Sequence, residues 1–311
     1  MFTQPSVAEP LVVWRFLDGR PGHESQSEGM VDALSRLGRL EVHNLRVGSK
    51  AKALIEYACA SFKAGWHLPA PSLLIGAGHA THLPMLAARR RFGGRVIVLM
   101  KPSMPLSCFD LCIVPEHDRP KDRANVIKTK GVLNTIRASE PQESGKGLIL
   151  LGGESKHYRW DSDYIFEQLL VLLNEHRQMD WTLTSSRRTP DRMIDLLKSK
   201  RFENLSFVPH TATPKGWVAE RMFESSEIWV TPDSVSMLYE AMTSINRVGV
   251  FGLASKENDS RVAAEVECLR DEGRLAGIDV QSKTIIRPVD AHTPLAETDR
   301  VARMIMEFFT L

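Results

Sequence analysis

The stretch DGRPGHESQ, which begins at Asp18, combines residue types that can bind and react with a polar ligand. Gly19 and Gly22 permit a tight turn and a close approach of a ligand to the backbone. His23 is the residue type that serves most readily as a general base near neutral pH. A plain strand–helix turn capped by Asp18 or Ser25 explains the same letters. Spacing alone leaves both interpretations open.

A second glycine turn lies in LLGGESKHYRWD, residues 150–161. Gly152 and Gly153 allow a ligand to approach the backbone, and Ser155 and Lys156 can bind an anion. The stretch resembles a diphosphate cradle, although the G-x-x-x-x-G-K-[ST] spacing of a P-loop is absent. Further basic side chains follow the turn, and we therefore favour a binding role over a plain glycine turn.

The segment TSSRRTP, residues 184–190, has side chains that suit phosphate oxygens. A capped helix start explains it as well, with Thr189 as the N-cap and Pro190 as the first helical residue. Both interpretations can hold together. The predicted anion-binding side chains here are Ser185, Ser186, Arg187 and Arg188.

The segment WVTPDSVSMLYEA, residues 229–241, predicts a capped helix that begins at a strand end. Asp233 or Ser234 can cap this helix, and its first turn, with Ser236, can then bind a phosphate. Glu240 follows about two turns later, where its carboxylate can accept hydrogen bonds from both hydroxyls of a ribose. An exposed helix glutamate is the plainer explanation of Glu240.

Two loops of the first half carry weaker signals. Glu116, in VPEHD, is of an acid–base or metal-ligand type. Gly78 and His79, in GAGHATHLP, follow an apolar run, but Thr81 replaces the third glycine of a dinucleotide motif. His79 and His82 lack a third ligand, so we predict no metal site. No Tyr-x-x-x-Lys pair is present, which counts against an oxidoreductase or epimerase of the short-chain type.

Short apolar runs alternate with amphipathic stretches along the chain, which predicts doubly wound α/β architecture with parallel sheets. The polar stretch at 138–147 is the predicted linker between two halves. Helices are predicted over 25–37, 162–177 and 297–310. Strands are predicted over 11–17, 40–47, 72–77, 95–100, 109–114, 147–152, 180–185, 205–210, 227–231 and 247–252.

Composition excludes several classes of protein. The 311 residues carry a formal net charge of +2, so no global charge favours nucleic acid. Four cysteines in a chain of this size do not form a disulfide framework. The N-terminus does not resemble a signal peptide, and no run approaches 18 apolar residues. We therefore expect a cytoplasmic protein.

Residues 50–69, KAKALIEYACASFKAGWHLP, combine lysines with aliphatic and aromatic residues. This composition suits an interfacial helix on anionic lipid, and RRRFGGR at 89–95 adds charge. A core-packing helix with solvated lysines is the commoner origin of such a pattern, and it is the favoured interpretation. A peripheral membrane contact through 50–69 stays as the alternative.

Taken together, DGRPGHESQSEG, PEHD with TKGVLNTI, LGGESKHYRWD, TSSRRTP and TPDSVSMLYEA resemble the plant mitochondrial-fission (elongated-mitochondria) factor family and its bacterial relatives. The chain also resembles GT-B glycosyltransferases, especially the lipid-linked N-acetylglucosamine transferase of peptidoglycan synthesis. His23 after Gly22, the Gly152–Gly153 turn and Glu240 take the places of that pattern. Glu154 before the serine, and Ser234 in place of the donor-helix glycine, depart from it.

The resemblance implies an α/β, GT-B-like fold of two Rossmann-like doubly wound domains facing a central cleft. Residues 1–140 would form the acceptor domain, with Asp18, Gly19, Gly22, Gly78 and His79 on the acceptor side. Residues 145–296 would bind a nucleotide-sugar through the 152–156, 185–188 and 233–240 loops. The final helix, 297–311, would pack back on the first domain.

The activity so implied is metal-independent transfer of a sugar from a nucleotide-sugar to an acceptor, with His23 as the base and Glu116 as a second catalytic residue. The acceptor would be a lipid-linked or glycolipid molecule at the inner membrane face, such as a lipopolysaccharide core intermediate. Two alternatives stay open. One is a non-catalytic adaptor, and the other is a nucleotide-sugar epimerase that uses Glu116, His117 and His210.

Overall fold

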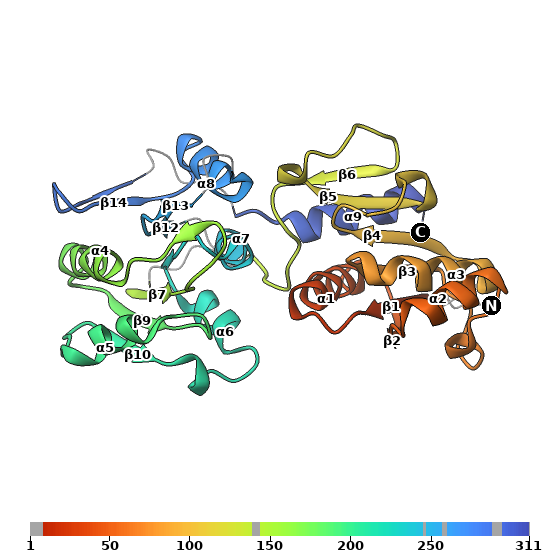
Figure 1. Ribbon diagram of the computed structural model, residues 1–311, viewed down its shortest axis with the longest axis horizontal. Coiled ribbons are helices and arrows are strands. Elements are labelled where there is room, and N and C mark those ends of the chain that lie inside the picture. Colours follow the sequence, from red (N-terminus) through yellow and green to blue (C-terminus); the bar gives the residue numbers. More distant parts are fainter. Residues whose placement is uncertain (1–8, 139–143, 245–246, 257–259, 288–293, 311) are drawn as a thin grey trace, which may run out of the picture. The chain divides into compact units, whose positions relative to one another are not determined.

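The computed structural model describes residues 9–138, 144–244, 247–256, 260–287 and 294–310. The chain divides into two compact units, one of residues 1–135 and 297–311 and the other of residues 136–296 (Figure 1). Part of the predicted linker, residues 139–143, lies outside the described residues. Each unit has its own parallel sheet.

The sheet of the first unit has six parallel strands in the order β2-β1-β3-β4-β5-β6. The chain runs from β1 outward to β2 and then returns to the opposite side of β1 as β3. This reversal is a topological switch point, where ligands bind in sheets of this type. The strands are β1 (Leu11–Leu17), β2 (Leu40–Arg46), β3 (Leu73–Ala77), β4 (Arg95–Leu99), β5 (Leu111–Pro115) and β6 (Val126–Thr129).

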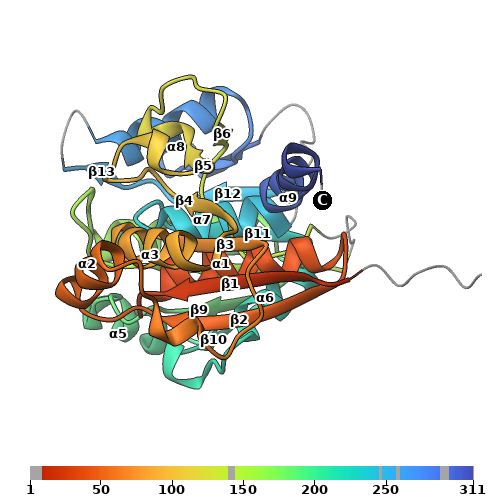
Figure 2. The same cartoon turned by 90° about the vertical axis from the view of Figure 1, so that its right-hand side faces the viewer.

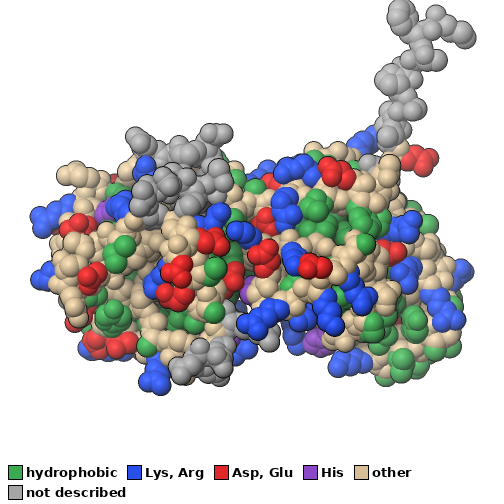
Figure 3. Space-filling model, turned by 90° about the horizontal axis from the view of Figure 1, so that it is seen from above, with side chains coloured by type: hydrophobic (Ala, Val, Ile, Leu, Met, Phe, Trp, Pro, Cys, Tyr) green, Lys and Arg blue, Asp and Glu red, His purple; other side chains and the backbone are tan. Residues whose placement is uncertain are grey.

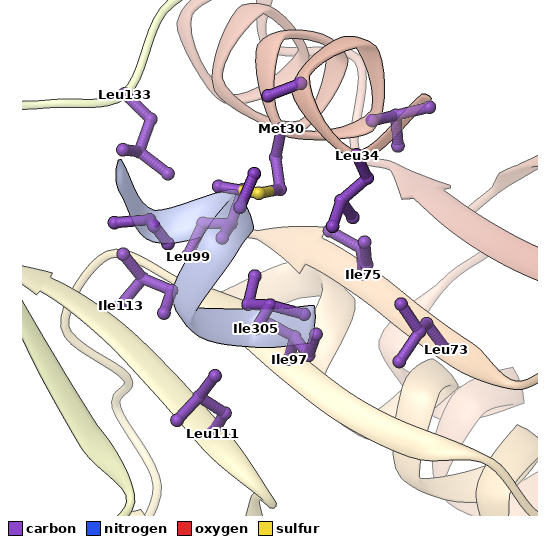
Figure 4. Close-up of a cluster of buried hydrophobic side chains, with 14 of the residues drawn as sticks. Met30, Leu34, Leu73, Ile75, Ile97, Leu99, Leu111, Ile113, Leu133 and Ile305 are labelled. Atoms are coloured by element: carbon purple, nitrogen blue, oxygen red, sulfur yellow. The ribbon is translucent and has the colours of Figure 1, made fainter. Parts of the chain in front are cut away.

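Helices cover both faces of this sheet. On one face, Met30 and Leu34 of α1 (Pro21–Ser35) pack with Ile305 of α9 (Glu297–Phe309) against the inward side chains of the strands (Figure 4). The last helix therefore belongs to the core of the first unit. On the other face, α2 (Lys50–Ala58) packs against α3 (His82–Phe92), and α3 contacts β3 and β4 (Figure 2).

The second unit repeats this arrangement with five parallel strands in the order β10-β9-β7-β11-β12. Its switch point lies between β7 and β11, because the chain runs outward to β10 before it returns beside β7. The strands are β7 (Lys146–Leu150), β9 (Asp180–Thr184), β10 (Leu205–Val208), β11 (Glu227–Val230) and β12 (Val248–Val250).

Helices α4 and α5 share a core with one face of the second sheet, and α6 and α7 lie on the opposite face (Figure 1). Two short strand pairs, β8 with β13 and β14 with β15, complete the unit. These elements are α4 (Ser162–Glu175), α5 (Asp191–Ser199), α6 (Trp217–Glu224), α7 (Val235–Ser244), α8 (Arg261–Asp271), β8 (Tyr158–Arg159), β13 (Ala254–Ser255), β14 (Gly277–Asp279) and β15 (Thr284–Ile286).

Several predicted boundaries and burial patterns were wrong. Helix α1 begins at Pro21 rather than near residue 25, since proline suits the first position of a helix. Helix α5 begins at Asp191, so Pro190 precedes the helix, and Thr189 is not its cap. Strand β2 is an edge strand with alternating exposure, not a strand buried on both faces. Phe308 is largely exposed instead of joining the buried stripe of α9.

Candidate functional site

A histidine–aspartate pair lies at the switch point of the first unit. His23 stands in the first turn of α1, and its Nδ1 lies 2.7 Å from Oδ2 of Asp18, the first residue after β1. The Asp18 side chain is 2% exposed and the His23 side chain 17%. A carboxylate only accepts hydrogen bonds, so Nδ1 donates and Nε2 is left as the basic nitrogen. The pair is therefore oriented for general-base chemistry.

Gly78, at the end of the neighbouring strand β3, permits this pair. A Cβ built on Gly78 would lie 2.3 Å from Nδ1 of His23 and 3.3 Å from Oδ2 of Asp18. Gly78 also has a φ of +80°, a conformation that glycine favours. The structure thus brings Asp18, His23 and Gly78 together, whereas the neighbouring His79 is exposed.

The two glycines of the opening motif differ in their roles. Gly19 has a φ of +80° and donates its N–H to Oε1 of Glu24, at 3.0 Å. Gly22 lies within α1, and a Cβ added there would meet no atom within 4 Å. A larger side chain would therefore fit at position 22, and packing does not require glycine there. Neither Asp18 nor Ser25 caps α1, whose N-cap residue is Arg20.

Arg15, a buried cation inside β1, positions the first turn of α1, and sequence reasoning missed it. Its guanidinium donates to Oγ of Ser27 at 2.9 Å and to the backbone carbonyl of Glu24 at 2.6 Å. These bonds connect the strand to the helix that carries His23. A charged residue in the middle of an apolar strand was the available signal, because such a cation is buried only with partners.

The structure does not bring Glu116 to His23. Glu116 is an exposed residue of the 3-10 helix Glu116–Asp118, which follows β5. Strand β4 separates β5 from β3, so the two strand ends lie about 10 Å apart. Among the described residues no hydrogen bond joins Glu116 to His23. The assignment of Glu116 to catalysis therefore receives no support from this geometry.

The glycine turn of the second unit, which follows β7, is closely packed. A Cβ on Gly152 would lie 2.2 Å from Oδ2 of Asp233, and one on Gly153 would lie 1.9 Å from the carbonyl oxygen of Arg188. Both positions therefore require glycine. The turn thereby packs against the loops that follow β9 and β11. The turn and these two loops are the three segments in which the donor-binding residues were predicted.

The backbone of this turn is not free to bind phosphate, which corrects the expected cradle. Ser155 is also engaged, since its hydroxyl accepts the N–H groups of His157 and Tyr158, each at 3.2 Å. The turn therefore provides shape rather than hydrogen-bond donors. Its N–H groups donate within the unit, Gly152 to Oγ1 of Thr231 at 2.7 Å, Gly153 to Oδ2 of Asp233 at 3.0 Å and Glu154 to the carbonyl of Arg188 at 3.3 Å.

An ion pair holds the glycine turn in place. Nη2 of Arg188 lies 2.8 Å from Oδ2 of Asp233, whose side chain is fully buried, and Nη1 donates to the Glu154 carbonyl at 2.8 Å. Asp233 therefore binds the turn and does not cap α7. Arg188 is a positioning residue, because its Nη1 and its Nη2 are both bound to groups of this unit.

The serines that precede Arg188 are engaged as well. Ser185 is buried, and its hydroxyl accepts the N–H of His210 at 3.1 Å and lies 3.4 Å from Nδ1 of the same residue. The Ser186 hydroxyl donates to the carbonyl of Gly152 at 2.8 Å. Thr189 donates to the same carbonyl rather than capping α5. These side chains connect loops, and His210 joins the predicted donor region.

Besides Glu240, four predicted residues remain for a ligand at this edge of the second sheet. Lys156 and Arg187 are exposed and form no ion pair within the described part of the chain. Ser234 directly precedes α7, and Ser236 is exposed in its first turn. The first turn of a helix offers free N–H groups and a partial positive charge. Together these features make an anion-binding edge.

Glu240 lies in α7, one and a half turns beyond its start. Burial raises the pKa of its carboxyl to about 7. Within the described residues no side chain or backbone group donates a hydrogen bond to it. A half-buried acid without a protein partner is available to a hydroxyl-bearing ligand.

Replacing Glu240 by Gln is expected to stabilise the unliganded protein at pH 8 by up to about 3 kcal/mol, because the glutamate must be ionised there against its burial. With a folded pKa of about 7, the penalty is small below the unfolded value of about 4.3 and grows until the pH passes 7. Urea unfolding at pH 5 and pH 8 measures the difference. The exposed Glu220→Gln is the control, and equal effects of Glu240→Gln at both pH values would contradict the prediction.

No group of three His, Cys, Asp or Glu side chains that could hold a metal ion occurs in the described ranges. His82, which was considered with His79, is a core side chain. Its ring packs edge-on against Phe109 at 5.1 Å, and burial lowers its pKa to about 4. His82 is therefore neutral near pH 7.

Comparison with known proteins identifies both relatives and fold. A sequence profile of the family described as Mitochondrial fission ELM1 matches residues 21–309. The uncharacterized protein RP120 of Rickettsia prowazekii (strain Madrid E) is 23% identical over 349 residues, which cover 94% of this chain and 97% of that protein.

Two solved structures resemble both units. A putative UDP-N-acetylglucosamine 2-epimerase from Listeria monocytogenes matches with a TM-score of 0.62 at 12% identity, over 97% of each chain. The UDP-GlcNAc 2-epimerase of Neisseria meningitidis, bound to UDP-GlcNAc, matches with a TM-score of 0.57 at 11% identity, over 96% of this chain and 100% of that chain. The predicted GT-B-like α/β fold of two Rossmann-like units is confirmed.

Proposed function

Since the chain belongs to the mitochondrial fission ELM1 family and has a GT-B-like fold, we propose that it is a glycosyltransferase that moves a sugar from a nucleotide-sugar to an acceptor. One observation carries the proposal. The switch point of the first unit holds an oriented base, Asp18–His23, and that of the second holds an anion-binding helix start followed by Glu240. Transfer between two bound substrates needs both functions.

The second unit binds the donor in this proposal. The first turn of α7 holds the diphosphate, with Arg187 and Lys156 as the free cations beside it. Glu240 accepts hydrogen bonds from the ribose hydroxyls. The glycine turn, held by Arg188 and Asp233, shapes the site without contributing N–H groups of its own.

The first unit activates the acceptor. Nε2 of His23 takes the proton of the acceptor hydroxyl, whose oxygen forms a bond to the anomeric carbon of the sugar. The bond from that carbon to the diphosphate oxygen breaks, and its electron pair leaves with the nucleotide. The dipole of α7 and the side chain of Arg187 stabilise the developing charge, so we propose a metal-independent reaction.

A thermal-shift screen over UDP, GDP, CMP and their sugars tests the donor site. UDP-GlcNAc is the first compound to try, since the Neisseria meningitidis structure is bound to it. We expect at least one compound at 100 times its Kd to add about 2.7 kcal/mol of stability. If none raises the melting temperature, the transferase proposal fails and the non-catalytic adaptor remains.

An epimerase is the second candidate, and one observation favours it. His210 is held by Ser185 beside the donor loops, where a titratable group could reach the sugar. Proton NMR of UDP-GlcNAc incubated with the chain alone distinguishes the two reactions. Signals of the C2 epimer without any acceptor support the epimerase, and an unchanged donor that is consumed only with a lipid extract supports transfer.

The acceptor side is proposed to contact a membrane. The structure contains no helix, within its described ranges, that is long and apolar enough to span a bilayer. Leu54 and Ile55 of α2 are 58% and 62% exposed, Tyr57 of the same helix is exposed, and so is Trp66, which follows the 3-10 helix Lys63–Gly65. We call these four residues the α2 patch. Neighbouring lysines give it the charge that anionic lipid attracts, so the favoured core-helix interpretation does not account for these side chains.

Replacing both Leu54 and Ile55 by Ser is expected to weaken binding to anionic vesicles at least tenfold, because their apolar surface then no longer enters the lipid. Vesicle co-sedimentation measures this, with phosphatidylcholine vesicles as the neutral comparison. Phe223→Ser, an equally exposed position on α6, is the control. Unchanged binding would remove the α2 patch as a membrane contact.

A further inference from the structure

A cavity of about 320 Å³ lies in the first unit, beside the connections that leave β4 and β5. Its volume is at the lower end of the range for small-molecule sites. Its lining includes the cations Lys101, Arg119, Lys121 and Arg123 and the apolar side chains of Met104 and Leu106.

The cavity is positively charged. Two carboxylates adjoin the lining cations in sequence, Asp118 and Asp122. Asp122 is bound by Lys128 at 2.6 Å, and that lysine does not line the cavity. Asp118 accepts a hydrogen bond from Nζ of Lys101 at 2.7 Å through its backbone carbonyl and not through its carboxylate. No carboxylate of the described residues lies within ion-pair distance of the lining cations. Four cations that no described carboxylate neutralises surround one small cavity and favour an anion there. These are Lys101, Arg119, Lys121 and Arg123.

One wall of the cavity is apolar. Met104, Leu106 and Val114 supply aliphatic and thioether surface beside the cations, and three prolines add to it. Met104 and Leu106 pack on the same core cluster as the buried side chains of α3. A site for a bare anion has no need of such a wall, so the ligand carries an apolar part next to its charge.

The place of the cavity matches the acceptor side of the first unit. Strands β4 and β5 are parallel to β1, so the segments that follow them leave the same edge of the sheet as Asp18. The β4–β5 connection also reaches α3, where Oγ of Ser103 lies 3.5 Å from Nδ1 of His82. Figure 3 views the first unit from the side of β5 and β6, and Lys and Arg side chains lie beside hydrophobic ones there.

We propose that this cavity binds a phosphate-bearing amphiphile. The phosphate contacts the four cations, and the first carbons of the alkyl chain pack on Met104, Leu106 and Val114. Within the proposed transferase, which this part of the inference rests on, the cavity holds the phosphate of a lipid-linked acceptor. Binding of the amphiphile itself needs no donor, so it can be measured separately.

Calorimetric titration of the full chain with octyl phosphate, inorganic phosphate and octanol tests the proposal. Octyl phosphate is expected to bind at least tenfold more tightly than either of the others, since only it offers both the charge and the apolar chain. Arg119→Gln with Arg123→Gln is expected to weaken octyl phosphate binding at least tenfold. The control variant, Arg39→Gln with Arg303→Gln, removes the same charge from exposed positions elsewhere in the unit. It is expected to leave the affinity for octyl phosphate unchanged.

Three outcomes overturn the proposal: equal affinity for inorganic phosphate, equal affinity for octanol, and an unchanged affinity in the Arg119 and Arg123 variant. Arg119 and Arg123 are both exposed, so we expect this variant to be folded, and urea unfolding measures its stability. The thermal shift with nucleotide-sugars is expected to be the same in this variant as in the wild-type chain. Failure of the cavity and failure of the donor site are therefore distinguishable.

Discussion

Replacing His23 by Ala is expected to lower the rate of sugar transfer by about 10²- to 10⁴-fold, which is the usual contribution of a general base. Nucleotide-sugar affinity is expected to stay within twofold of the wild-type value, because the proposed donor site lies in the other unit. The assay measures release of the nucleoside diphosphate from the donor in the presence of a bacterial lipid extract. Transfer and donor binding are thus read separately on the same variant.

Two further variants show whether His23 acts together with Asp18. Asp18→Asn is expected to reduce transfer, because an amide can donate to Nδ1 and so favour the tautomer with the proton on Nε2. His43→Ala, on the edge strand β2 of the same unit, is the control and is expected to change neither rate nor affinity. Transfer by His23→Ala within threefold of the wild-type rate would remove His23 as the base.

The same substitution is expected to change a different property at each of the adjacent arginines, nucleotide binding at Arg187 and stability at Arg188. Arg188→Met leaves the buried carboxylate of Asp233 without its counter-charge, so we expect a loss of about 2–4 kcal/mol in the free energy of unfolding. Arg187→Met removes an exposed cation that forms no ion pair with any described residue, so we expect unchanged stability and weaker nucleotide binding. Urea unfolding and calorimetric titration measure the two effects.

Each arginine variant is the control for the other, because both remove one positive charge from the same loop. Arg188→Met together with Asp233→Asn is expected to recover part of the lost stability, since no buried charge is then left unpaired. If Arg188→Met were as stable as the wild-type chain, the ion pair would not hold the glycine turn. If Arg187→Met bound the nucleotide normally, Arg187 would not contact the phosphates.

The architecture could be predicted because it depends on local patterns. Leucine- and isoleucine-containing runs such as β3 and β7 are buried on both faces, and amphipathic stretches such as α4 separate them. The strand ends were therefore found to within a few residues. Strand β6 and the short strands β8 and β13 to β15 were missed, because runs of two to four residues carry little periodic signal.

The types of residue at the candidate site could be predicted, but the contacts between residues far apart in the sequence could not. Gly152 and Gly153 were selected as places where a ligand approaches, yet they are needed because Asp233 and Arg188 come so close. These partners lie about 35 and 80 residues away along the chain, and no local pattern indicates such a contact. Glu116 is the converse case, since its type suited catalysis while the strand order does not place it beside His23, and its role stays a prediction.

Calorimetric titration of the full chain with the nucleotide-sugar that gives the largest thermal shift tests the central claim most directly. We expect one site per chain with a Kd of about 1 μM to 1 mM, from which the corresponding nucleoside diphosphate displaces the nucleotide-sugar. Gly153→Ala, whose Cβ would meet the Arg188 carbonyl, is predicted to lose at least tenfold in affinity, while Gly277→Ala, where nothing lies within 4 Å, keeps it. Absence of binding by the wild-type chain, or an unchanged affinity in Gly153→Ala, would contradict the account.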